Sequence, residues 1–386
     1  MFNIQYKIRH KPIVVVLALH LGAVLHAQIV KERDTLDRQT FADGSEYIHV
    51  NVPSMPLQYY VYKFKMSKKN KLNAVFANNR LPDLKRETIE MVSNRETTAD
   101  NTVMAAINGD FFSYKNGEVE GFQVSNNQIV YAHIDKMKFG VNIDKKNYIR
   151  LDSVYFKGEL KTKQSNYALT GVNTIKYNEA EQSIILYDSH IDFDSIQPKN
   201  HTLVLIKKHR RKFSYVNVLK SLPNDLGDKD YILALNMPNT ESIIAELEQQ
   251  RLFKINLRLV NKRTARALKL SSHISGGVPL VVKGRNVIKN KETISGSRGG
   301  IHPRTALGVN AKDNTVVWIV VDGRSDSSKG VNYKELSQLF LENNCTDALN
   351  LDGGGSSALW LLGEIKNTPS DKNGARPCLN YLLLSH

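Results

Sequence analysis

The sequence predicts an α+β (mixed α/β) fold in which a strand-rich mixed sheet is accompanied by a few helices. Short apolar runs rich in β-branched and aromatic residues recur along the chain, which is typical of strands. Three segments, 86–94, 240–250 and 333–343, have apolar residues at helical spacing instead. The last lies between the apolar runs 316–321 and 348–351, so we expect a C-terminal βαβ unit whose two strands are parallel neighbours.

Most of the remaining apolar runs are short enough to be single strands. One of them contains Asn126 and Asn127, a pair that favours the tight turn of a hairpin. We expect strands at 59–66, 72–77, 103–107, 122–131, 183–187, 202–207, 255–260, 278–283, 316–321, 348–351, 358–362 and 379–384.

The N-terminus has the pattern of a secretory signal peptide. Lys7, Arg9 and Lys11 precede an apolar run over 13–25, and small Ala27 follows it. We therefore expect residues 1–27 to be a leader that directs the protein to the periplasm or out of the cell. No later run reaches the roughly 20 apolar residues of a membrane helix, so no membrane span is expected.

Composition limits the classes of partner. With 386 residues, 41% of them hydrophobic, the chain can bury a substantial core, and its formal net charge of +15 favours anionic partners. The alternative is a dispersed, solvated basic surface. The densest basic cluster, 209–212, lacks the interleaved aromatic residues of a stacking site, so no nucleic-acid partner is expected.

The cysteines exclude two kinds of site. Cys345 and Cys378 are too far apart in sequence for a zinc or redox motif. A disulfide in an exported protein and a pair of buried free thiols both remain open. We expect no metal and no cofactor.

Four segments place glycine, carboxylate and guanidinium groups at the ends of apolar strands. In the first, a strand leads into Asn108, Gly109 and Asp110, for which an Asx turn is the structural alternative. In the second, His302 and Pro303 precede Arg304 and Thr305, and the guanidinium of Arg304 offers a planar set of donors suited to carboxylate or phosphate.

The third and fourth segments follow the two strands of the expected βαβ unit. Asp322 and Arg324 flank a glycine where the first strand ends, and ligands of open α/β sheets bind beyond such strand ends. After the second strand, Asp352 leads into three glycines. These glycines predict close backbone approach to a ligand, with successive N–H groups forming a nest for an anion. The residues of this stretch are Asp352, Gly353, Gly354, Gly355, Ser356 and Ser357.

The same stretch resembles other motifs less well. Ser356 and Ala358 share part of the nucleophile elbow of serine hydrolases, but a strand rather than a helix is expected next. A phosphate-binding Walker loop is excluded because no Gly-Lys-Ser/Thr follows the glycines. Two weaker turns complete the set, Gly276-Gly277 and the segment from Arg376 to Asn380.

Taken in order, these segments resemble the phosphodiester glycosidase family. The chain has Asn-Gly-Asp-Phe-Phe at 108–112, Gly-Gly-Val-Pro-Leu-Val-Val at 276–282, Pro-Arg-Thr-Ala-Leu-Gly at 303–308, Asp-Gly-Arg at 322–324, Asn-Leu-Asp-Gly-Gly-Gly-Ser-Ser at 350–357 and Arg-Pro-Cys-Leu-Asn at 376–380. The resemblance begins near residue 103. It implies a catalytic domain over 101–386. From the residues themselves we expect 28–100 to be N-terminal strands of the same domain and 145–230, which contains no motif, to be a possible insertion.

The resemblance also implies hydrolysis at the anomeric carbon of a sugar linked through phosphate, with an anionic or phosphorylated glycan as substrate. Glycosidases of this kind use paired carboxylates. Asp322 and Asp352 are the first pair, with Asp110 and Glu120 in reserve.

The remaining candidates would bind the substrate. Arg304, Arg324 and the stretch 353–357 would hold the phosphate, and Asn108, His302, Thr305 and Asn380 the sugar. Gly109, Gly276, Gly277 and Arg376 complete the predicted site.

Three alternatives remain open. The carboxylates of Asp110, Asp322 and Asp352 could converge on a hard divalent ion. The same groove could belong to a non-catalytic protein that binds envelope glycans, or Ser356 could serve a serine esterase. The sequence leaves the oligomeric state open.

Overall fold

The computed structural model describes residues 33–134, 137–177, 182–289 and 299–386. The predicted leader, residues 1–27, lies outside the described residues, so the leader and the expected export stay predictions. No helix in the described part of the chain is long and apolar enough to cross a membrane.

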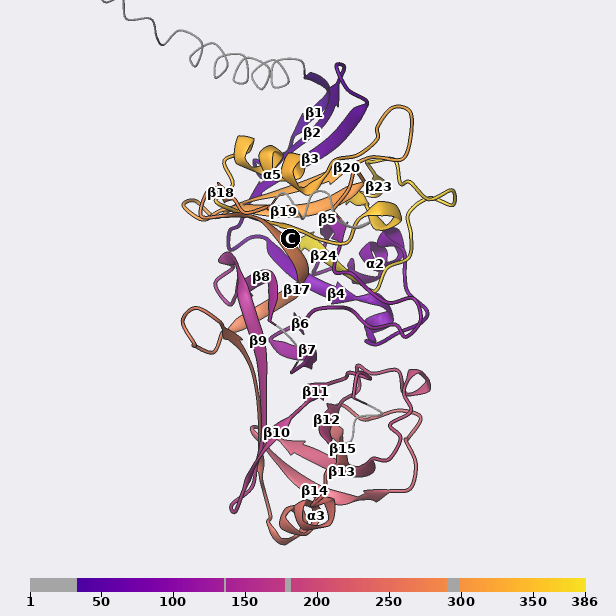
Figure 1. Ribbon diagram of the computed structural model, residues 1–386, viewed down its shortest axis with the longest axis vertical. Helices are drawn as coiled ribbons and strands as arrows, with labels where there is room; N and C mark the ends of the chain where they lie inside the picture. Colours follow the sequence, from indigo (N-terminus) through magenta and orange to yellow (C-terminus); the bar gives the residue numbers. More distant parts are fainter. Residues whose placement is uncertain (1–32, 135–136, 178–181, 290–298) are drawn as a thin grey trace, which may run out of the picture.

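The upper part of the molecule in Figure 1 is built in four layers. A large sheet and a five-stranded sheet pack face to face, and one core lies between them. Helix α5 (Tyr333–Glu342) covers the outer face of the large sheet, whereas α2 (Ile89–Glu96) covers the outer face of the smaller one. Because side chains alternate along a strand, β20 (Thr315–Val321) contributes Trp318 to the core between the sheets and Ile319 to the layer beneath α5.

The large sheet of this part is antiparallel. Its order is β1, β2, β3, β20, β19, β21, β17 and β18. The strands are β1 (Asp34–Thr40), β2 (Glu46–Val52), β3 (Leu57–Lys65), β17 (Leu270–Val282), β18 (Arg285–Asn286), β19 (Arg304–Asn310), β20 (Thr315–Val321) and β21 (Asp347–Asn350).

The smaller sheet has the order β23, β22, β5, β24 and β4, and all its pairs are antiparallel. Its strands are β4 (Lys71–Phe76), β5 (Val103–Asn108), β22 (Leu359–Leu361), β23 (Glu364–Ile365) and β24 (Asn380–Ser385). The strand ends of β5, β19, β20 and β21 bring the four predicted motif segments to one end of the two sheets.

Strands continue downward in Figure 1 into a second lobe. The connecting strands are β6 (Gln123–Ser125), β7 (Gln128–His133), β8 (Lys138–Asp144), β9 (Ile149–Lys161) and β16 (Lys254–Asn261). The lobe contains β10 (Asn166–Leu169), β11 (Gly171–Val172), β12 (Ser183–Tyr187), β13 (Thr202–His209), β14 (Lys212–Leu219), β15 (Asp230–Asn236) and α3 (Thr240–Gln249). Three 3₁₀ turns, η1 (Ala77–Asn79), η2 (Phe193–Ser195) and η3 (Gly354–Ser356), complete the described elements.

The α+β fold class is confirmed, and the hairpin and the three helices lie close to their predicted positions. Asn126 and Asn127 both have positive φ angles, 48° and 66°, as the expected hairpin turn requires. Helix α5 begins with a capping box in which Asn332 and Glu335 satisfy each other's backbone N–H groups.

The expected adjacency of the βαβ strands is wrong. Strands β20 and β21 run in the same direction, but β19 lies between them and pairs antiparallel with both. The helical crossover therefore spans one intervening strand. The parallel pair that makes the sheet mixed is β11 with β12, in the second lobe.

Both cysteines of the chain are buried free thiols. Cys345 packs beneath α5 and Cys378 beneath α2, on the outer faces of different sheets. Burial raises the pKa of each thiol to about 12. Of the two alternatives left by the sequence, the structure has the free thiols.

Trp318 provides a test of the packing between the two sheets. Its side chain is fully buried on β20 and meets Phe64 edge to face with ring centroids 5.1 Å apart. Trp318→Ala should lower the free energy of unfolding by about 3–5 kcal/mol because it leaves a cavity. Urea denaturation measures this, and Val216→Ala, on an exposed position of β14, should change it by less than about 0.5 kcal/mol. Equal effects of the two substitutions would contradict this packing.

Candidate functional site

The side chain of Asn108 connects the two sheets at the predicted site. It lies at the end of β5 and is completely buried. Its Oδ1 accepts from the hydroxyl of Thr305 on β19 at 2.6 Å and from the N–H of Ala358 at 3.2 Å. Its Nδ2 donates to the carbonyl of Asp352 at 2.8 Å. These bonds fix the loop after β21 against the smaller sheet.

That loop, residues 352–357, is called the glycine bend below. A β-carbon at Gly353 would lie 2.8 Å from the carbonyl oxygen of Pro303, and one at Gly354 would lie 2.8 Å from Nη2 of Arg324. A β-carbon at Gly355 would overlap Nη2 of Arg376. The glycines are therefore needed for close approach to groups of the chain itself.

The predicted anion nest is not formed as expected. The N–H groups of Gly354, Ser356 and Ser357 donate to backbone carbonyls, and that of Gly353 donates to the Asp352 carboxylate. Internal acceptors thus use most of the donors that the sequence assigned to a ligand. The groups available to a ligand at the bend are therefore the guanidinium groups packed against it.

Asp110 is a buried acid in this arrangement. It is 2% exposed, its N–H donates to Oδ1 of Asn380, and its Oδ2 accepts from the N–H of Gly121 at 2.6 Å. A β-carbon at Gly276 would overlap its Oδ1, which explains the glycine there. Burial raises the pKa of Asp110 well above its usual range, and the charge of Glu120 adds to this shift.

The backbone segment that carries Asp352 lies next to the segment that carries Asp110, and Asp352 is only half-buried. Its N–H donates to the carbonyl of Gly109 at 2.9 Å, so adjacent backbone segments carry the two acids. Its Oδ1 accepts from the N–H of Gly353, and its charge acts on nearby Arg376. An N–H donor and a guanidinium group stabilise its negative charge.

Asp322 has a different environment. Its carboxylate accepts from the hydroxyl of Tyr60 at 3.0 Å, from Nδ2 of Asn367 at 3.3 Å and from the N–H of Thr368 at 3.0 Å. Burial raises its pKa, while these donors oppose the shift. Asn367 also donates to the carbonyl of Ser357, so Asp322 supports one flank of the glycine bend.

Arg304 lies on the opposite face of the large sheet, beneath α5. It is 3% exposed, and its Nε donates to the carbonyl of Val331 at 3.0 Å while its Nη2 donates to that of Gly300. Its Cζ lies 4.3 Å from the ring centroid of Tyr333. Burial lowers the pKa of this guanidinium, although Tyr333 opposes the shift.

The other two predicted arginines are accessible. Arg324 is exposed in a left-handed backbone conformation, with φ of 63°, and its guanidinium lies against Gly354. Arg376 is half-buried and binds the carboxylate of Asp371 through Nε and Nη2, at 2.7 and 2.9 Å. That ion pair raises the pKa of Arg376.

The predicted sugar contacts are mostly internal. Asn108, Thr305 and Asn380 are at most 1% exposed, and their side chains are bonded inside the molecule, so the geometry does not support direct contact with a sugar. His302 is half-buried and exchanges backbone hydrogen bonds with Val331. A β-carbon at Gly277 would overlap the carbonyl of Asn350. These residues position the site.

Two alternatives from the sequence are not supported. Ser356 lies in a 3₁₀ turn that leads into strand β22, not in the strand-turn-helix arrangement of a nucleophile elbow, and it is 1% exposed. The three aspartates do not converge as metal ligands: within the described ranges no group of three His, Cys, Asp or Glu side chains could hold an ion.

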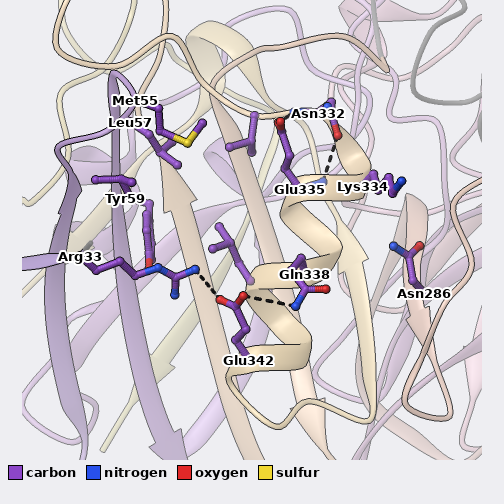
Figure 2. Close-up of a pocket in the computed structure, with 13 residues that line it drawn as sticks. Arg33, Met55, Leu57, Tyr59, Asn286, Asn332, Lys334, Glu335, Gln338 and Glu342 are labelled. Atoms are coloured by element: carbon purple, nitrogen blue, oxygen red, sulfur yellow. Dashed lines mark hydrogen bonds and ion pairs between the residues drawn. The ribbon is translucent and has the colours of Figure 1, made fainter. Parts of the chain in front are cut away.

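A separate pocket of about 350 Å³ lies between α5 and the strands β2 and β3 and contains none of the predicted site residues (Figure 2). Arg33 and Gln338 both point toward Glu342 at one end, and Asn332 caps the helix at the other. Its walls are mainly apolar. The pocket is lined by Arg33, Val52, Met55, Leu57, Tyr59, Asn286, Val331, Asn332, Lys334, Glu335, Gln338, Leu339 and Glu342.

The sequence matches a known family over its C-terminal part. Residues 223–385 match the model of the phosphodiester glycosidase family. The matched range includes Arg304, Asp322, the glycine bend and Arg376, whereas Asp110 lies before it. The resemblance seen in the motifs is thus confirmed.

Individual relatives agree over shorter stretches. The uncharacterized protein YomE, derived from the SPbeta prophage of Bacillus subtilis, is 46% identical over 70 residues, which are 18% of this chain and 11% of that protein. The N-acetylglucosamine-1-phosphodiester alpha-N-acetylglucosaminidase of Bos taurus is 38% identical over 71 residues, 18% of this chain and 13% of that enzyme. This chain therefore matches only a small part of the length of either relative.

A crystal structure of a hypothetical protein from Synechocystis shares the fold. Its TM-score is 0.66 with 15% sequence identity, over 91% of this chain and 64% of that chain. Similarity at this level of identity concerns the fold alone.

Sequence reasoning missed several residues of the site. Tyr60, Asn367 and Asp371 each bind a predicted residue, but they lie in stretches without a motif. The glycines that pack against Arg324 and Arg376 were a signal that bulky side chains lie against the bend. The identity of those side chains could not be inferred from the glycines.

Asn108 tests the connection between the sheets. Asn108→Ala leaves the Thr305 hydroxyl, the Ala358 N–H and the Asp352 carbonyl without their buried partner, so the free energy of unfolding should fall by about 2 kcal/mol or more. Chemical denaturation measures the change. Exposed Asn373→Ala should leave stability within about 0.5 kcal/mol. An Asn108→Ala protein as stable as this control would refute the connection.

Proposed function

We propose that this protein hydrolyses a sugar-1-phosphodiester, breaking the bond between the anomeric carbon and the phosphate oxygen. Water supplies the new hydroxyl on the sugar, and the phosphate departs as a monoester. The observation that carries the proposal is the pairing of two unlike acids, Asp110 and Asp352, on hydrogen-bonded backbone segments beside accessible arginines. The match of residues 223–385 to the phosphodiester glycosidase family model supports the reaction class.

The two acids divide the proton chemistry. Glycosidases need one protonated and one ionised carboxyl group, and environments that separate two carboxyl groups in this way identify the roles. Buried Asp110 retains its proton and is the donor. Asp352, next to an N–H donor and Arg376, is the ionised partner that acts on the sugar side. Asp322, whose oxygens are already bonded, positions the bend through Asn367.

The arginines act on the phosphate. A phosphate leaving group is a stable anion, so stabilising its charge contributes more than strong acid assistance. Arg324 and Arg376 flank the glycine bend from two sides, and their guanidinium groups match phosphate oxygens in geometry. Arg304 holds the backbone at Gly300 and Val331 and thereby positions the strand that supports the bend.

A substrate panel tests the reaction class. The purified protein should release sugar from sugar-1-phosphate diesters and not from ordinary aryl glycosides. Asp352→Asn should retain substrate binding but lower turnover by about 10²–10⁴-fold, because it removes the ionised carboxylate. Asp34→Asn, an exposed acid on β1, is the matched control and should keep full activity.

Two outcomes of this panel would reject the proposal. Release of sugar only from aryl glycosides would exclude the phosphodiester substrate. Binding of a phosphorylated glycan without turnover at any time would indicate a non-catalytic glycan-binding protein instead.

The pH profile tests the role of Asp110. Since burial raises the pKa of this acid, it stays protonated at pH values where an ordinary carboxyl group is ionised, and kcat/KM should fall as the pH rises through that raised pKa. In Asp110→Asn, kcat/KM should be low and should lack this alkaline decline. The same alkaline decline in both proteins would assign it to another group.

A further inference from the structure

Tyr114 lies on the surface between two arginines near the glycine bend. Its side chain is 52% exposed. The Cζ atom of Arg86 lies 4.6 Å from its ring centroid, and that of Arg376 lies 5.9 Å from it. Arg376 also packs against Gly355, so this group of side chains lies next to the glycine bend.

The guanidinium group of Arg86 lacks a hydrogen-bond partner at one of its nitrogens. Its Nη1 is buried and has no hydrogen-bond partner, and no carboxylate within the described residues forms an ion pair with it, whereas Arg376 is paired with Asp371. A buried guanidinium N–H without a partner is costly. Arg86 also precedes the N-terminus of α2, where a cation is unfavourable.

The backbone of Arg86 is strained as well. Its φ angle is 46°, a left-handed conformation that a residue with a β-carbon adopts rarely. The neighbouring residue holds it there, because Glu87 and Cys378 exchange two backbone hydrogen bonds and Arg95 binds the Glu87 carboxylate. Strain maintained by its surroundings is frequent at binding sites.

We propose that Arg86 and Tyr114 form a subsite for a second acidic group on the leaving side of the substrate. This rests on the proposed function. Arg86 contributes a positive charge that forms no ion pair with the described residues, on a planar guanidinium suited to a phosphate or carboxylate. The exposed part of the Tyr114 side chain contacts the apolar part of the same group. The substrate class is therefore a sugar-1-phosphodiester whose alcohol or second phosphoryl part carries a further negative charge.

The pairing of Glu87 with Cys378 fixes this subsite relative to the acids. Cys378 is two residues from Arg376, and the hydroxyl of Tyr381 donates to the carbonyl of Glu87. The distance from Arg86 to the glycine bend is thus set by the same segment that carries Arg376. A group extending from the phosphate past Arg376 reaches Tyr114 and then Arg86.

The test compares two kinds of leaving group on one sugar. The first substrate is the methyl diester of the sugar-1-phosphate. The others carry a second phosphate, as in a uridine diphosphate sugar, or a carboxylate, as in a glycerate ester of the phosphate. Arg86→Gln should lower kcat/KM by about 10- to 100-fold on one or both acidic substrates and by less than about 3-fold on the methyl diester. Arg251→Gln, an exposed arginine elsewhere, should change neither.

A binding measurement separates this inference from the proposed function. Calorimetric titration needs no turnover. It compares Asp352→Asn with Asp352→Asn/Arg86→Gln, each titrated with the uridine diphosphate sugar and with the glycerate diester. The double variant should bind one or both ligands about 10-fold or more weakly than Asp352→Asn does. If the unmodified protein hydrolyses neither kind of substrate, the proposed function is rejected, whereas the subsite is still tested by the binding measurement.

Two results would overturn the subsite. One is an Arg86→Gln protein that loses activity equally on the methyl diester and the acidic substrates. The other is a double variant that binds both acidic substrates as tightly as Asp352→Asn. The thermal melting temperature of Arg86→Gln should be no lower than that of the unmodified protein, because the substitution removes an unbalanced charge.

Discussion

The buried carboxamide of Asn108 is the interaction on which the arrangement of the site depends. It bonds β5 of the smaller sheet to Thr305 of the larger sheet and to the loop after β21 at the same time. Most other contacts between the two sheets are apolar and therefore non-directional, although the N–H of Ala74 on β4 also donates to the hydroxyl of Ser272 on β17 at 2.6 Å. A buried amide with three partners does not tolerate small shifts, because each lost bond leaves a polar group unsatisfied. This sets the position of the glycine bend.

The bend in turn determines where charges lie. Its glycines allow Arg324 and Arg376 to approach the backbone from two sides. The stem of Arg304 also lies near Gly353, but its guanidinium lies against Tyr333 beneath α5. Arg324 and Arg86 both have left-handed backbones, and neither has a carboxylate partner among the described residues. Positive charge is thus concentrated at one end of the sheets at a cost in conformational strain, which an anionic ligand would offset.

Much of this could be predicted from the sequence because the relevant signals are local. Helix α5, the Asn126-Asn127 hairpin and the strands that end in motif segments follow from periodicity and turn chemistry. Strand order does not, and β19 lies between β20 and β21 although it precedes both in the chain. The three consecutive glycines correctly indicated that other groups approach the backbone closely. The local sequence could not reveal that these groups are side chains of the protein itself. Arg86 was not found, because only tertiary contacts bring it to Tyr114.

In the proposed mechanism a phosphate group binds over the glycine bend between Arg324 and Arg376. A crystal structure of the Asp352→Asn protein with an uncleaved sugar-1-phosphate diester measures this most directly. We expect phosphate oxygens within hydrogen-bond distance of both guanidinium groups and the sugar beside residue 352. A diester bound instead in the pocket along α5, or held by neither arginine, would contradict it.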